Sequence, residues 1–149
     1  MSAYPILLLE TDIDDRLVRI PLAVRMKLDL SACKISLDHW RMLDQEQRHA
    51  LFSMPAETDA DIDAFRTALV AGLAQVGGPS PQNSPHAVSE WKESGPVPHR
   101  VRKMLRQGEI ELDWSALGRF GRYVIWRIAS KADLKELRKA AMEIGGQLP

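Results

Sequence analysis

Apolar residues in the first part of the chain recur at helical spacing. Ile20, Val24 and Leu28 fall on one helical face. Pro21 suits a first helical turn, because its missing N–H costs nothing there. We therefore expect the first helix over about residues 20–32.

Capping residues predict a short turn and a second helix after it. Ser36 or Asp38 can cap the turn, and Asp44 with Gln47 resembles a capping box for a helix that ends before Pro55. The side chains that we expect to point inward are those of Trp40, Leu43, Ala50, Leu51 and Met54.

The clearest helical pattern covers residues 58–76. Thr58 and Asp61 form a capping box, and Gly77–Gly78 provides a stop. Between them runs an apolar stripe made of Ile62, Phe65, Leu69 and Leu73. This pattern predicts an amphipathic helix with one buried face.

Residues 77–97 are rich in Pro, Gly and Ser and poor in apolar side chains, which is typical of a linker. Trp91 is the exception. Burial of so large an aromatic side chain is favourable, so we expect Trp91 to pin the linker to the core.

The pattern of the first part then restarts. Val97, Val101 and Leu105 repeat the spacing of the first helix, and Pro98 stands where Pro21 stood. Trp114 follows as Trp40 did, and a last helix is expected after Ser130 and Asp133, read as a capping box, with Leu134, Leu137, Ala141 and Ile144 on its apolar face.

We interpret this as two degenerate helix-turn-helix repeats, over about residues 17–55 and 97–130. Helix pairs that cannot bury their apolar faces alone would form one core together. The expected fold is a single all-α domain of about six helices over residues 1–149, preceded by a short extended N-terminal segment.

Composition limits the class of protein. The 149 residues are 45% apolar and 27% charged, as in an ordinary globular protein. No segment approaches the roughly 18 apolar residues of a membrane span, and the chain shows no signal-peptide pattern, so we expect a cytoplasmic protein. Cys33 is the only cysteine, which excludes an internal disulfide, and we expect it to be a small buried residue.

Charge is distributed unevenly although the formal net charge is zero. Residues 1–95 carry 9 Lys and Arg against 14 Asp and Glu (−5), and residues 96–149 carry 11 against 6 (+5). Such an asymmetry can guide the binding of a partner.

Arginines at equivalent positions of the two repeats locate this basic surface. Arg25 corresponds to Arg102 and Arg48 to Arg122, but only the first-half members have acidic residues at helical spacing, Asp29 and Asp44. The residues that we expect to bind a partner are Arg102, Lys103, Arg106, Arg119 and Arg122. The alternative is that Glu109, Glu111 and the acidic first half neutralise this surface within the fold.

The candidate chemistry gives little support to catalysis. The histidines at 39, 49, 86 and 99 show neither a metal spacing nor a neighbouring nucleophile, so we expect no enzyme, metal or cofactor. The segment DADID at 59–63 lacks the Gly and the bidentate Glu of a calcium loop. GRFGRYV at 118–124 faintly echoes an RNA-binding motif but fits a helix better, which makes nucleic-acid binding the weaker reading.

The segment from Tyr4 to Pro55 resembles the nitrate reductase-associated proteins. The family pattern Ile-Pro-x-x-Val-Arg-x-Lys-Leu-Asp is met in full by residues 20–29, and looser similarity continues to about residue 130. The motif residues that we expect to be structural are Pro21, Arg25, Lys27, Trp40, Arg48, Pro98 and Trp114. The chain departs from the family at Arg19 and Ala56, where cysteine is expected, and at Ala32, where glycine is expected.

The resemblance implies an accessory role in nitrate assimilation. Nitrate reductase would be the partner, and the chain would assist its maturation or activity, for example at cofactor loading, through protein–protein contacts. The runner-up hypothesis is a small module that binds nucleic acid or a phosphate ligand with its basic second half. An enzyme is the third, because no nucleophile, base and oxyanion donor can be assembled from the sequence.

Overall fold

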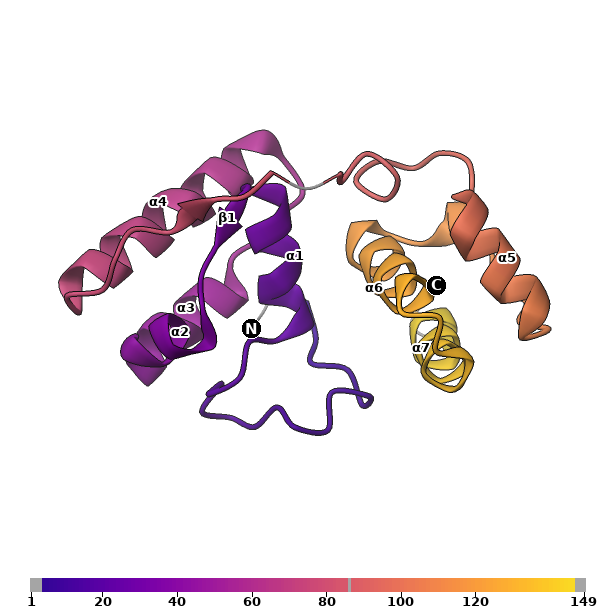
Figure 1. Cartoon of the computed structure of the whole chain (residues 1–149), viewed down its shortest axis with the longest axis horizontal. Coiled ribbons are helices and arrows are strands. Elements are labelled where there is room, and N and C mark those ends of the chain that lie inside the picture. Colours follow the sequence, from indigo (N-terminus) through magenta and orange to yellow (C-terminus); the bar gives the residue numbers. More distant parts are fainter. Residues whose placement is uncertain (1–3, 86, 147–149) are drawn as a thin grey trace. The chain divides into compact units, whose positions relative to one another are not determined.

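The computed structural model describes residues 4–85 and 87–146, and in this part of the chain it is all-α apart from one two-residue strand pair (Figure 1). The elements are α1 (Leu22–Leu30), β1 (Cys33–Lys34), α2 (Leu37–Met42), α3 (Gln45–Ser53), α4 (Asp59–Gln75), β2 (Gln82–Asn83), α5 (His99–Gln107), the 3-10 turn η1 (Trp114–Ala116), α6 (Arg119–Ser130) and α7 (Leu134–Gly146). Residues 4–20 form neither helix nor strand. The predicted all-α class is confirmed.

The described residues divide into two compact units. Unit 1 contains residues 4–6 and 10–85, and unit 2 contains residues 7–9 and 87–146. The predicted linker is therefore shared, since its first part belongs to unit 1 and its second part to unit 2. The organisation as a single domain stays a prediction.

Unit 1 is built from helices whose ends the sequence marks clearly. Asp44 and Thr58 form capping boxes with Gln47 and Asp61, as predicted. At the start of α1, Pro21 has no side-chain cap, and the carboxylate of Glu10 accepts the Leu22 N–H at 2.7 Å instead. Acceptance by a carboxylate satisfies one of the donors that a helix start leaves without a partner.

The core of unit 1 lies where α1, α3 and α4 pack together. The predicted stripe of α4 is buried along its whole length, and Trp40 and Leu43 are buried as expected. Two of the predicted inward positions are wrong, because Ala50 is exposed and Met54 is only half-buried. Phe52, on the same helix, is buried instead.

Unit 1 also contains a short antiparallel pair of strands, β1 and β2. Cys33 pairs with Asn83 and Lys34 with Gln82, and the Ser84 N–H donates to the Ala32 carbonyl at 2.8 Å. The first part of the predicted linker is thus attached to the end of α1.

Unit 2 consists of α5, α6 and α7, with α6 packed against both of the others. Trp91 is fully buried and lies edge-on to Tyr123 at 4.8 Å between ring centroids, which confirms that it anchors the linker. The predicted capping box at Ser130 is wrong, because Ser130 ends α6. Asp133 caps α7 by accepting the Glu136 N–H at 3.1 Å.

The helices α1 and α5 have the same length and resemble each other at both ends. Each has nine residues and follows a proline, Pro21 or Pro98, at its N-cap. Each is followed by a non-glycine residue in the left-handed region, Ala32 at φ 55° and Glu109 at φ 52°. These pairs are equivalent under the predicted repeat.

The helices α4 and α7 make similar arginine contacts to the ends of α1 and α5. In unit 1 Arg66 of α4 donates to the carbonyl of Ser31, the C-cap of α1, and in unit 2 Arg138 of α7 donates to the carbonyl of Gly108, the C-cap of α5. Both helices lie outside the bounds of the predicted repeat, which stays a prediction.

Ala32 supplies a direct test of the backbone at the end of α1. An L-residue in the left-handed region costs about 1 kcal/mol that glycine does not. Replacement of Ala32 by Gly should therefore raise the free energy of unfolding by about 1 kcal/mol in urea denaturation, and this strain gives a physical reason for the glycine expected here in the family.

The matched control for Ala32 is Ala71→Gly, at an exposed position inside α4. There the same chemical change should lower the free energy of unfolding by about 0.5–1 kcal/mol. A destabilising Ala32→Gly would show that residue 32 does not have a left-handed backbone.

Candidate functional site

The candidate site is the exposed side of α5, which we call the α5 basic face. It is formed by Arg100, Arg102, Lys103 and Arg106, all of them exposed. Val101, Met104 and Leu105 are buried on the opposite side of the helix. The α5 sequence therefore separates cations from apolar residues at helical spacing.

Within the described residues, the hydrogen bonds of this face go to uncharged groups. Arg100 donates to the Ser130 hydroxyl at 3.2 Å, and Arg102 donates to the Val97 carbonyl at 3.4 Å. No ion pair joins the four cations to an acidic residue in residues 4–85 and 87–146. Like charges at positions i and i+4, such as Arg102 and Arg106, repel each other, and an acidic partner would relieve that repulsion.

Arg119 and Arg122 do not belong to this face, which corrects the sequence-based prediction. Both are 6% exposed. Arg122 donates to three carbonyls, those of Trp91 at 2.7 Å, Leu117 at 2.6 Å and Lys92 at 3.0 Å. Its guanidinium group therefore fastens the segment before α5 to α6 and is not available to a partner.

Arg119 is held in a similar way. It donates to the Lys92 carbonyl at 3.1 Å and pairs with the exposed carboxylate of Glu93 at 3.1 Å. The prediction failed because it searched for acidic side chains at helical spacing. The acceptors are mostly backbone carbonyls, which every residue carries and no charge pattern reveals.

Arg48 has the same role in unit 1. Its guanidinium group donates to the carbonyls of Leu43 and Arg16, and not to Asp44 as the spacing predicted. Asp44 instead caps α3. Arg48 and Arg122, which the predicted repeat pairs, are thus alike in bonding, since each donates to the carbonyl of a leucine five residues earlier, Leu43 or Leu117.

The remaining motif residues occupy structural positions. Pro21 and Pro98 are N-caps, and Trp40 and Trp114 are 0% and 2% exposed. The Trp40 Nε1–H donates to the Leu17 carbonyl at 2.7 Å. Arg25 is half-buried on α1.

Lys27 is the most unusual residue of unit 1. It is fully buried, and its Nζ donates to the carbonyls of Leu51 at 2.9 Å and Phe52 at 2.6 Å. The rings of Tyr4, Phe52 and Phe65 lie 5.5–6.0 Å from the nitrogen. Burial lowers the pKa of Lys27 from 10.5 to about 7, because a charged amine is poorly solvated in this environment.

Pro55 explains why a donor is needed at this place. In a continuing helix the Leu51 carbonyl would accept the N–H of residue 55, but proline has none, and within the described residues the backbone N–H that this carbonyl accepts is that of Met54, at 3.4 Å. The Lys27 amine supplies hydrogen bonds to the end of α3 instead. The combination of a lysine on the apolar side of the first helix with a proline after the third was the available sequence signal.

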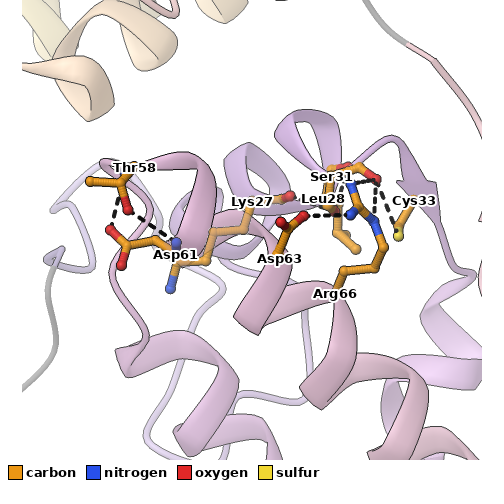
Figure 2. Close-up of polar contacts among 8 residues, drawn as sticks. All are labelled: Lys27, Leu28, Ser31, Cys33, Thr58, Asp61, Asp63 and Arg66. Atoms are coloured by element: carbon orange, nitrogen blue, oxygen red, sulfur yellow. Dashed lines mark hydrogen bonds and ion pairs between the residues drawn. The ribbon is translucent and has the colours of Figure 1, made fainter.

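Ser31 and Cys33 follow the C-terminus of α1, about one turn beyond Lys27 (Figure 2). Two nitrogens of Arg66 converge on the Ser31 carbonyl at 3.1 and 3.0 Å, while Arg66 also pairs with Asp63 at 2.9 Å. Cys33 is buried with its Sγ 3.5 Å from the same carbonyl. This cluster stabilises the C-terminus of α1, where acceptors would otherwise lack donors.

The described residues contain no group of three His, Cys, Asp or Glu side chains that could hold a metal ion. None of their helices is long and apolar enough to span a membrane.

The comparisons with known proteins give one match. No curated protein and no solved structure is significantly similar to the chain. The sequence model of a family described as conserved nitrate reductase-associated protein matches residues 6–144, which is nearly the whole chain. The chain therefore belongs to the nitrate reductase-associated protein family.

Proposed function

We propose that this protein is a non-catalytic accessory protein that binds nitrate reductase through the α5 basic face and assists its maturation or activity. The family description supports the association. The single observation that carries the binding surface is the row of exposed cations on α5, which pair with no acid in the described residues. The proposed compartment is the cytoplasm.

The chemistry of the face indicates an acidic protein surface as its partner. Guanidinium groups bind carboxylates through two parallel hydrogen bonds, and three of the four cations are arginines. Such a face accelerates encounter and fixes orientation more than it adds affinity. This behaviour suits a helper that must bind and then leave, for example at cofactor loading.

Charge reversal on α5 tests this proposal. A tagged protein with Arg102, Lys103 and Arg106 all replaced by Glu should recover at least tenfold less nitrate reductase from nitrate-grown cells than the unaltered protein does. The expected loss follows from repulsion between the new carboxylates and an acidic partner. The recovered polypeptides would be identified by mass spectrometry.

The matched control reverses three exposed cations outside α5, namely Lys131 at the C-cap of α6 and Lys135 and Lys139 on α7. It changes the net charge by the same amount in the same unit, so it should leave recovery nearly unchanged. Equal loss in both variants would point to net charge alone, and equal recovery in all three proteins would remove α5 from the proposal.

The α5 basic face also favours a second candidate, the binding of nucleic acid or another phosphate ligand. Phosphate contacts release counterions, so this binding would fall steeply as salt increases. Nucleic acid recovered in place of the reductase, and lost in the α5 variant, would support this candidate.

A further inference from the structure

Lys27 does not belong to the proposed binding surface. The position that corresponds to it in unit 2 carries a different type of residue. Under the predicted repeat, Lys27 of α1 corresponds to Met104 of α5, and both side chains are buried. Unit 2 therefore accommodates an apolar side chain of similar length at the corresponding position, that of Met104. A buried lysine is less favourable for folding than a buried methionine, because burial disfavours the charged form of its amine.

The hydrogen bonds around Lys27 match an uncharged amine. A neutral amine has two N–H groups, and the structure gives the nitrogen two oxygen acceptors, the carbonyls of Leu51 and Phe52. A charged amine has a third N–H, and no third oxygen in the described residues accepts it. The three aromatic rings at 5.5–6.0 Å compensate the charge only in part.

The acidic and basic groups on the surrounding segments are held by other contacts. The Tyr4 phenol donates to Glu57 and accepts the Ala56 N–H. On α4, Asp61 accepts N–H groups of Glu57 and Thr58, and Asp63 pairs with Arg66.

The other two elements that adjoin Lys27 are α3 and α1. On α3, Arg48 and His49 contact the backbone carbonyls of residues 15, 16 and 43. On α1 itself, Arg25 and Asp29 are half-buried. No carboxylate is hydrogen-bonded to Lys27 in the described residues.

We infer that Lys27 makes unit 1 a proton-sensitive device, in which the N-terminal segment at Tyr4 and the end of α3 close over the amine most stably when the amine carries no charge. Protonation of Lys27 in the closed state weakens this packing. The Tyr4 contact and the end of α3 are then the places where unit 1 opens to hydrate the amine.

The direction of the pH effect follows from the two protonation states. The pKa of Lys27 is about 7 in the folded protein and 10.5 in the unfolded chain, so the unfolded chain binds more protons between these values. Stability contributed by this group is therefore complete above pH 10.5 and is lost as the pH falls to about 7. Within this window the unfolding equilibrium constant should rise by up to about tenfold for each pH unit of decrease.

The test compares the full-length protein with its Lys27→Met variant, which carries the residue of unit 2. Urea denaturation of both would be measured from pH 6 to 9.5, with Lys34→Met at an exposed position as the control. We expect the ratio of the unfolding equilibrium constant of the wild type to that of Lys27→Met to be about 100-fold larger at pH 7 than at pH 9.5. The Lys34→Met curve should stay parallel to that of the wild type.

A direct titration of Lys27 keeps the inference testable if the variant fails to fold. The Nζ resonance of Lys27 in the unaltered protein should titrate near neutral pH by nitrogen NMR, and the protection factors of the amides of residues 51–54 and 56 should be lower below the midpoint than above it. A Lys27 amine that titrates near 10.5, or parallel pH curves for wild type and Lys27→Met, would overturn the inference.

Discussion

Replacement of Arg122 by Met is expected to lower the free energy of unfolding by about 3–5 kcal/mol. The methionine fills most of the space but donates no hydrogen bonds, so the carbonyls of Trp91, Leu117 and Lys92 lose a buried donor. Each buried polar group left without a partner costs about 1–3 kcal/mol. Urea denaturation followed by tryptophan fluorescence would measure the loss.

Arg102→Met is the control for Arg122, because it removes the same charge from the exposed side of α5. A surface change of this kind should alter stability by no more than about 0.5 kcal/mol. Similar denaturation midpoints for the two variants would contradict the burial of the Arg122 guanidinium group. The pair also separates the structural arginine from one proposed to bind the partner.

Replacement of Trp40 by Ala should have an effect of similar size in unit 1. The side chain is fully buried, and its truncation removes core packing together with the hydrogen bond to Leu17. Large-to-small changes of this type cost about 3–5 kcal/mol. Denaturation in urea would again report the change.

Trp40→Phe divides that cost into its two parts. Phenylalanine keeps most of the packing but leaves the Leu17 carbonyl without the indole donor, so a loss of about 1–2 kcal/mol is expected. If Trp40→Ala unfolds at the wild-type midpoint, Trp40 does not belong to the core.

The helices and much of the core were predictable because local signals specify them. Capping boxes at Asp44 and Thr58 and the stripe of α4 depend on residues three or four apart, which a sequence displays directly. Position 50 was wrong because Arg48, Leu51 and Phe52 form the buried side of α3, and Ala50 lies on the opposite side of that helix.

The candidate site was predictable only where the helix has two distinct sides. The cations of α5 alternate with apolar residues, and the exposed positions follow from that spacing. Arg119 and Arg122 lie on α6, whose residues 119–125 are all buried, so helical spacing identifies no solvent side there. Several of their hydrogen-bond acceptors belong to residues 91–93, about 30 positions away in the sequence. No local pattern relates those residues to α6.

Lys27 was missed as a special residue for a related reason. Its sequence context is a family motif, which indicated a structural role but not the burial of an amine. The acceptors on Leu51 and Phe52 lie 24 and 25 residues away, at the end of a helix that Pro55 does not continue. A long-range contact of this kind follows from tertiary packing.

The most direct test of the proposed function is a binding titration between the purified protein and purified nitrate reductase, in its cofactor-free and loaded forms, at low and physiological salt. We predict saturable binding that charge reversal at Arg102, Lys103 and Arg106 abolishes and reversal at Lys131, Lys135 and Lys139 preserves. Absence of binding to both forms of the reductase, or equal binding by the two variants, would contradict an accessory role that acts through the α5 basic face.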